Sequence, residues 1–356
     1  MKRLTFYLAR LFATDALILF GIACFMMWMV QCLRAFDVVS VKGQGILTLA
    51  LQGLLTMPPL ALVFFYVCVG IGLARALRAL QTNHELHIVH IGNGIGSLWR
   101  ATMVVAGIGV VAVLLLSNYL EPHAMRRLAA LNASVAADMV SSTLKPRRFT
   151  QVTPGVVLLI GGREGDGEIS EFFADDRRDP ETRRTYIAET ARVTGDGDSY
   201  VLELRDGALQ YTESDGRFSE ISFARYDIGV EQFSQPIGGL DALTTTDSFV
   251  LIGNALSTGV WAPEVVEKLN TRMGEGLRVV GICMLVLAIA GFPSGRRPRY
   301  TLPTEMVVLL LAFGERGISS YSPLGQTTGA WLMILFAGIA LVWRLRPRKV
   351  VLEALA

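Results

Sequence analysis

The chain has 356 residues, 52% of them hydrophobic, and a net charge of only +2. Together with a mean hydropathy of +0.44, this excludes an ordinary soluble protein and indicates one embedded in a membrane. The small net charge hides a segregation. Residues 121–275 hold 25 acidic and 16 basic side chains, whereas the rest holds 6 acidic and 17 basic ones. We therefore expect an acidic soluble insert carried on a basic membrane frame.

Six apolar stretches are long enough to predict membrane helices, although two of them are short. They cover residues 11–33, 46–74, 101–120, 277–292, 302–321 and 328–343. The second contains Pro58-Pro59, which predicts a kink because an interior proline removes a helix hydrogen bond. The expected domains are residues 1–120 with spans one to three, 121–275 outside the membrane, and 276–356 with spans four to six.

Between the second and third spans lies a comparatively polar segment, residues 74–100. Its apolar residues recur at three- and four-residue steps, which predicts a helix over 76–91 that ends near Gly92. Two interpretations stay open: an interfacial connector, or a coupling helix that presses on a cytoplasmic partner. In the coupling-helix interpretation, Glu85 forms an ion pair with a basic residue of the partner, because it is the only acid between Asp37 and Glu121.

The orientation follows from the charges at the ends of the spans. One set of ends carries 13 lysines and arginines, and the other carries only Arg34, Lys42, Arg278 and Arg316. Because basic loops stay in the cytoplasm, we expect both termini and the 76–91 helix there, and the insert on the opposite side.

The insert is expected to begin as a helix over 121–143 and then to change to β-structure. Short β-rich runs alternate with Asp-Gly turns such as RDG at 205–207, which indicates an antiparallel sandwich or open barrel. The runs cover residues 156–160, 169–173, 185–193, 200–205, 208–212 and 218–226.

Candidate site residues are few. His84, His87 and His90 fan around a helix at three-residue steps, so we expect no metal site there. No nucleophile constellation and no Walker A lysine motif occurs, so no catalytic residue or cofactor is expected. Arg34, Lys42 and Arg316 near the outer ends of spans have two interpretations. They either snorkel to the interface or bind an anionic lipid headgroup.

The order of these features resembles the lipopolysaccharide export permease family, LptF/LptG (also called YjgP/YjgQ), and is nearer LptF. The residues that carry the resemblance are Tyr7-Leu8-Ala9-Arg10, the Pro58-Pro59 span, Asn83-His84-Glu85-Leu86, the strand beginning Tyr186-Ile187-Ala188, Leu204-Arg205-Asp206-Gly207, and Phe223-Ala224-Arg225-Tyr226.

The resemblance implies an α-helical protein with six transmembrane helices and an inserted periplasmic all-β, jellyroll-like domain, in the bacterial inner membrane. It implies a transporter subunit that extracts lipopolysaccharide and is not itself an enzyme. The implied partners are a second, LptG-like permease, a cytoplasmic LptB-like ATPase dimer that binds ATP, and an LptC-like periplasmic bridge. The implied ATPase-coupling residues are Glu85, His84, Leu86 and His87.

The alternative function is a membrane-anchored periplasmic sensor or adaptor. It would need a cytoplasmic output domain, whereas the longest expected cytoplasmic segment is the loop at 75–100. A membrane enzyme that acts on lipid would need a catalytic group, and the sequence offers no candidate.

Overall fold

The computed structural model describes residues 2–42, 46–91, 95–138, 146–163, 168–196, 199–213, 216–229, 242–292, 303–323 and 325–345. For residues 2, 35–42, 135–138, 153, 196, 199 and 242 it describes the backbone only. The chain divides into two compact units. The helical unit comprises Met1–Gln31, Met57–Pro122 and Thr246–Ala356, and the β unit comprises Cys32–Thr56 and His123–Thr245.

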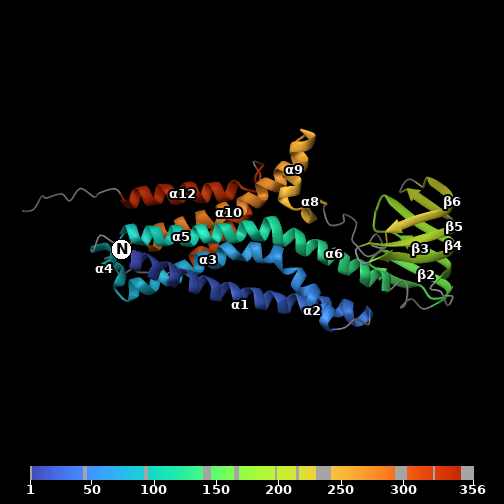
Figure 1. Ribbon diagram of the computed structural model, residues 1–356, viewed down its shortest axis with the longest axis horizontal. Coiled ribbons are helices and arrows are strands. Elements are labelled where there is room, and N and C mark those ends of the chain that lie inside the picture. The colour runs from blue at the N-terminus through green and yellow to red at the C-terminus, as the bar shows by residue number, and fades with distance from the viewer. Residues whose placement is uncertain are drawn as a thin grey trace, which may run out of the picture. The chain divides into compact units, whose positions relative to one another are not determined.

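Long helices build the helical unit (Figure 1). They are α1 (Lys2–Lys42), whose end belongs to the β unit, α3 (Met57–Thr82), α4 (Glu85–Ile91), α5 (Ile95–Leu115), α9 (Ser248–Thr258), α10 (Pro263–Ala290), α11 (Thr304–Tyr321) and α12 (Thr328–Leu345). A π-helical turn, η1 (Leu116–Leu120), joins α5 to α6 (Glu121–Asp138), so the third span does continue into the predicted helical extension.

Five of the described helices are long and apolar enough to cross a membrane: 3–34, 57–82, 95–134, 263–290 and 328–345. The chain is therefore a multi-pass membrane protein, but the expected count of six spans is not confirmed. The missing one is α11, which has the length of a span but carries Glu305, Glu315 and Arg316. These three charges lower its hydropathy below that of the other candidates.

Two predicted helices have different bounds in the structure. The 46–74 stretch is divided at Thr56 into α2 (Ile46–Leu55) and α3, and Pro58 and Pro59 occupy the first turn of α3, where a helix needs no N–H donor. The 76–91 helix is also divided, because residues 76–82 continue α3 and His84 has a φ of 61°. The glycines at 92–94 lie outside the described residues.

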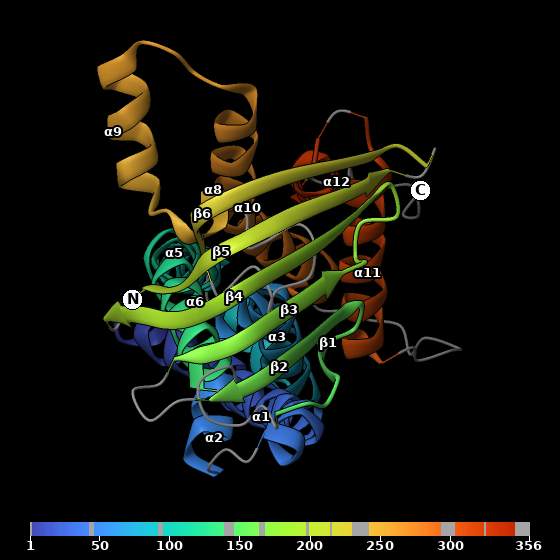
Figure 2. The same cartoon turned by 90° about the vertical axis from the view of Figure 1, so that its right-hand side faces the viewer.

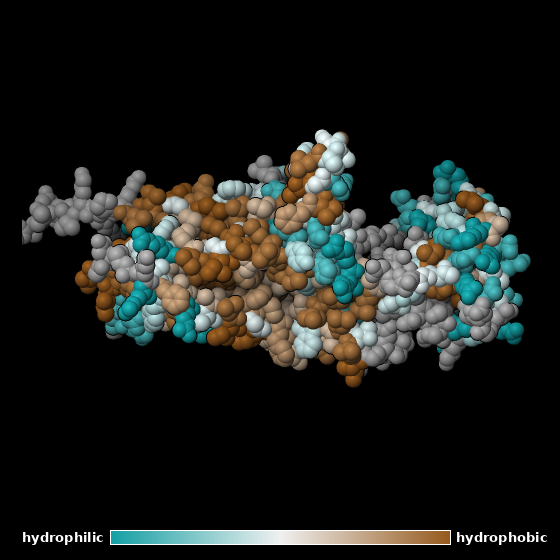
Figure 3. Space-filling view, viewed as in Figure 1, coloured by the Kyte–Doolittle hydropathy of each residue, from teal (hydrophilic) through white to brown (hydrophobic). Residues whose placement is uncertain are grey.

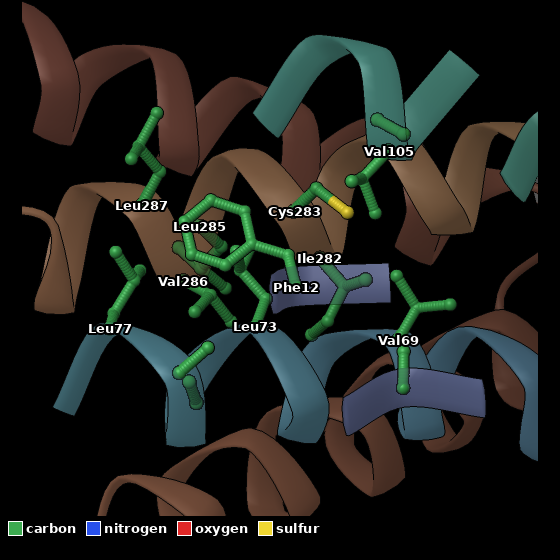
Figure 4. Close-up of a cluster of buried hydrophobic side chains, with 14 of the residues drawn as sticks. Phe12, Val69, Leu73, Leu77, Val105, Ile282, Cys283, Leu285, Val286 and Leu287 are labelled. Atoms are coloured by element: carbon green, nitrogen blue, oxygen red, sulfur yellow. The ribbon is translucent and has the colours of Figure 1, made fainter. Parts of the chain in front are cut away.

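The core of the helical unit forms around α10, which packs against α3, α5, α11 and α12. Phe12 of α1 is fully buried, and Leu73, Ile282 and Cys283 point toward the same apolar cluster (Figure 4). Cys68 and Cys283 are buried free thiols, and Cys24 and Cys32 are partly buried ones, as expected for packing residues. The fourth span is longer than predicted, since α10 begins at Pro263.

The β unit contains α2, α6, the short α8 (Ala242–Thr245) and one antiparallel sheet. Its strands are β1 (Thr150–Thr153), β2 (Val156–Arg163), β3 (Ile169–Asp176), β4 (Thr182–Asp196), β5 (Ser199–Glu213) and β6 (Phe218–Gly229). They lie in sequence order in a twisted sheet (Figure 2). The described strands thus form a meander, whereas a jellyroll needs two Greek keys.

One predicted turn lies inside a strand. RDG at 205–207 was expected to end a hairpin, yet β5 continues through it and pairs with β4 and β6 on both sides. Asp206 adopts a left-handed backbone conformation with a φ of 47°, and a Cβ on Gly207 would collide with the backbone of Ile187. The Asp-Gly pair therefore bends the sheet locally instead of reversing the chain.

Apolar side chains cover much of the visible surface of the helical unit, which is coloured brown in Figure 3. Residues such as Phe25, Ile108, Phe313 and Phe336 are exposed on it. In water such a surface would be unfavourable, but it suits contact with lipid chains. The β unit instead buries alternate residues, for example Val156, Leu158 and Ile160 of β2, as a sheet with one covered face does.

Candidate functional site

Four charged side chains meet inside the helical unit. Arg278 of α10 is 1% exposed and lies between two carboxylates. Its Nη1 is 2.6 Å from Glu275 Oε1, one helical turn away, and its Nε is 2.9 Å from Glu315 Oε1 of α11. Arg316 completes the group, with its Nη2 3.1 Å from Glu275 Oε2. Two arginines and two glutamates make this network electrically neutral.

Polar neighbours satisfy most of the remaining hydrogen-bonding groups. Arg278 Nη2 donates to the carbonyl of Gln326 at 2.8 Å, so all three guanidinium nitrogens of this arginine are used. Ser319 donates to Glu315 Oε1 at 2.9 Å and accepts the backbone N–H of Gly329. A Cβ on residue 329 would lie 2.5 Å from the carbonyl oxygen of Glu315, so only glycine allows this approach of α12 to α11.

The tyrosine of a third helix closes the network on the α3 side. The Tyr66 hydroxyl lies 3.2 Å from the carbonyl oxygen of Ala312 and 3.4 Å from Glu315 Oε2. The guanidinium carbon of Arg316 stands 5.5 Å from the centroid of the Tyr66 ring, a cation–π distance. Elements from α3, α10, α11 and the start of α12 are thereby held together by charge-assisted bonds, which are the stronger class of hydrogen bond.

Arg316 differs from the other members of the network because its side chain remains 29% exposed. It makes one ion pair, and its Nε has no hydrogen-bond partner among the described residues. The carboxylate that neutralises it is Glu275 and not the adjacent Glu315, because neighbouring residues on a helix point about 100° apart. Arg316 is therefore the most exposed member of the network.

The other expected headgroup residues do not belong to this network. Arg34 is an exposed residue of α1 and forms no ion pair with any described residue. Lys42 lies in the last turn of α1, and its side chain is outside the described part of the structure. Glu275 and Arg278 were missed at the sequence level, because they were assigned to the insert and to a loop end. Their i, i+3 spacing on one helix was the available signal.

The second candidate site is helix α4 with the turn that precedes it. Leu86 is fully buried and Val89 nearly so, which anchors α4 in the core of the helical unit. The Leu86 side chain thus holds the helix in place. His84 is exposed, His87 is half-buried with its ring 6.0 Å from that of His84, and half-buried Glu85 forms no ion pair with the described residues.

Residues 6–347 match the family model described as lipopolysaccharide export system permease LptF/LptG. The chain belongs to the LptF/LptG family. The match spans both units, so the sheet is part of the family's architecture and not an addition to it. A comparison with curated proteins gives no significant match.

As an LptF/LptG permease, the chain is a membrane subunit of lipopolysaccharide export and not itself an enzyme. The two candidate sites differ in their chemistry. One is a neutral charge network buried among long apolar helices. The other is the short helix α4, where the carboxylate of Glu85 has no ion-pair partner among the described residues.

Proposed function

We propose that this permease pairs with a second, LptG-like permease and an LptB-like ATPase dimer to extract lipopolysaccharide from the inner membrane. An LptC-like bridge in the periplasm would receive the lipid. The observation that carries the ATPase part is α4. Buried Leu86 and Val89 fix this helix to the bundle, while Glu85 offers a carboxylate with no ion-pair partner among the described residues. A force applied at Glu85 would therefore move the packed helices behind it.

We further propose that α11 is a sixth span and that both termini are cytoplasmic. The charges that lower its hydropathy are each paired: Glu305 with Arg78, Glu315 with Arg278, and Arg316 with Glu275. Since Arg278, Arg316 and Arg78 are paired inside helices, they no longer count as loop charges. Two bases, Arg34 and Lys42, then remain at one set of ends against 12 at the other. The positive-inside rule then supports the same orientation more strongly.

Arg316 is proposed as a headgroup-binding residue of the helical unit, and Arg34 and Lys42, which belong to the β unit, are separate candidates for the same role. Arg316 supports this role because it is the partly exposed member of an otherwise buried network. Arginine suits a phosphorylated lipid, because its planar fork makes two hydrogen bonds to phosphate and stays charged when partly buried.

The β unit is proposed to pass the lipid to the bridge through the edge of its sheet. Strand β6 is the last in the strand order and is exposed along most of its length, including Phe218 and Ile221. An unpaired strand edge can add a strand from another sheet through main-chain hydrogen bonds.

The test is co-purification of the full chain in mild detergent, comparing Glu85→Ala with Glu264→Ala. Both substitutions remove one acid without an ion pair among the described residues, but Glu264 lies in the first turn of α10. Loss of a charge-assisted contact costs about 1.5–3 kcal/mol, so Glu85→Ala should reduce the recovered ATPase roughly tenfold or more while Glu264→Ala retains it.

Equal recovery of ATPase in both variants, together with unchanged ATP-driven lipid release, would show that Glu85 is not the coupling residue. Recovery of the wild-type chain with neither an ATPase nor a second permease would instead favour the sensor or adaptor function.

A further inference from the structure

An apolar cavity lies at the α4 end of the helical unit, away from the charge network. It has a volume of about 280 Å³ and opens between α4, α5, the end of α10 and the end of α12. Its described lining is apolar except for one histidine and one arginine: His90, Ile95, Gly96, Leu98, Trp99, Arg100, Leu287, Gly291, Phe292, Leu341 and Leu345. This is close to the lower limit of ligand pockets, about 300 Å³, and is far larger than a packing defect.

The mouth of the cavity is positively charged. Arg100 lines it directly, and the guanidinium carbon of Arg344 stands 5.7 Å from the centroid of the Phe292 ring, which forms part of the wall. Neither arginine forms an ion pair with a carboxylate of the described chain. An apolar cavity beneath two arginines without acidic partners favours a ligand with an apolar chain and an anionic head.

His90 adds a hydrogen-bonding preference. Its Nδ1 lies 2.9 Å from the carbonyl oxygen of Leu86, which can only accept, so Nδ1 is the donor of this bond. The Nε2 is buried and has no partner among the described residues. A buried polar nitrogen without a partner is unfavourable, and a hydroxyl group can both donate and accept, so a ligand that brings a hydroxyl group to this place would be stabilised.

We propose that this cavity binds an anionic phospholipid with a hydroxylated headgroup, of the phosphatidylglycerol type. Part of one acyl chain fills the cavity, Arg100 and Arg344 hold the phosphate, and a headgroup hydroxyl forms a hydrogen bond with His90 Nε2. The bound lipid thereby joins α4 to α5, α10 and α12. This site differs from the proposed binding site of the exported lipid, and the proposal does not depend on how that lipid is recognised.

Trp99, in the cavity wall, provides the measurement. The chain has five tryptophans, so Trp28, Trp261, Trp331 and Trp343 are replaced by phenylalanine to leave Trp99 as the only fluorophore. This full-length protein is reconstituted in zwitterionic vesicles that contain increasing fractions of phosphatidylglycerol with brominated acyl chains. A specific site predicts quenching that saturates at a low mole fraction, whereas boundary lipid predicts quenching proportional to the mole fraction.

Two variants separate the acyl chain from the headgroup. Gly96→Leu should abolish the saturable quenching, because Gly96 lines the cavity and a Cβ there meets no atom within 4 Å, so the helix can accept a larger side chain beside the ligand. Arg100→Gln/Arg344→Gln should raise the half-saturating mole fraction about tenfold or more, since each arginine contributes independently to binding. Arg3→Gln/Arg10→Gln removes two arginines of α1 instead and should leave the curve unchanged.

Native mass spectrometry of the protein with all its tryptophans gives an independent readout. One retained phosphatidylglycerol is expected in the wild type and the Arg3/Arg10 variant, but not in Gly96→Leu. Proportional quenching in every variant would show boundary lipid only, and an identical curve with brominated phosphatidylcholine would refute the headgroup assignment. Absence of quenching, with Trp99 emission changed by the ATPase instead, would show that the cavity receives a protein side chain, and the proposal would be wrong.

Discussion

Replacing Arg278 by methionine should destabilise the helical unit strongly. Arg278 is 1% exposed and donates to Glu275 at 2.6 Å, Glu315 at 2.9 Å and the Gln326 carbonyl at 2.8 Å. In the variant, Glu275 keeps Arg316, but Glu315 keeps only the hydroxyls of Ser319 and Tyr66. An uncompensated buried carboxylate of this kind costs about 3–5 kcal/mol.

The assay is thermal unfolding of the full chain in detergent, followed by the fraction that remains monodisperse. A loss of 3–5 kcal/mol corresponds to a decrease in Tm of about 6 °C or more. The Tm of Arg278→Lys should fall between those of the wild type and Arg278→Met, because lysine keeps the charge but cannot make all three bonds in the same geometry. The double variant Arg278→Met/Glu315→Gln should recover most of the loss, since it removes the orphan charge.

The double-mutant cycle also provides the refutation. If Glu315→Gln does not rescue Arg278→Met, or if the two effects add without a coupling of at least about 1 kcal/mol, the network is not an energetic unit. If Arg278→Met has the Tm of the wild type, the burial argument itself is wrong.

Three further outcomes are expected. A cysteine at Asp196 should react with a membrane-impermeant thiol reagent added from outside spheroplasts and one at Asn93 should not; the reverse pattern would invert the topology. Photocrosslinkers at Arg34 and Arg316 should capture lipopolysaccharide, and crosslinks only to bulk phospholipid with normal transport in the double alanine variant would leave both arginines as snorkelling residues. Burial raises the pKa of Asp175, but hydrogen bonds and charges from Arg183 and Arg177 outweigh it and lower the pKa below its usual range. The ion pairs of Asp175 therefore stabilise the β unit fully when the pH is above the ordinary aspartate pKa of about 3.9, and this stabilisation is lost as the pH falls through the lowered pKa. Asp175→Asn should lower the stability near pH 6 and make it depend less on acid pH, measured in circular dichroism melts.

The sequence predicted the features that depend on neighbouring residues. Runs of apolar residues predicted six spans, of which five are found among the described helices, and short β-rich runs between turn signals located most strands of the insert. The predicted ends of strands and helices were wrong where a turn or kink signal competed with the tendency of the element to continue. Asp206-Gly207 is a turn signal, but pairing on both sides of it outweighs that preference and β5 continues. Pro58-Pro59 was expected to kink one helix, and the chain instead starts a new helix there.

The charge network was beyond local reasoning. Glu315 and Arg316 are adjacent in the sequence, but the structure pairs them with Arg278 and Glu275 of another helix. Such pairings depend on how α10 and α11 pack, and no single-sequence pattern records that packing. The composition of α11 could only show that three charges sit in an apolar helix. It could not show that each has a partner.

The pairing between α10 and α11 has a consequence for biogenesis. In the proposed topology, α11 entering the bilayer alone would bring Glu315 and Arg316 into hydrocarbon, and a charged residue at a helix centre costs about 2.5–3.5 kcal/mol on insertion scales. The partners of both residues, Arg278 and Glu275, lie in the helix that leaves the ribosome just before. If the two helices enter as a hairpin, their four charges are already neutralised, so the translocon would have to retain α10 until α11 has been synthesised.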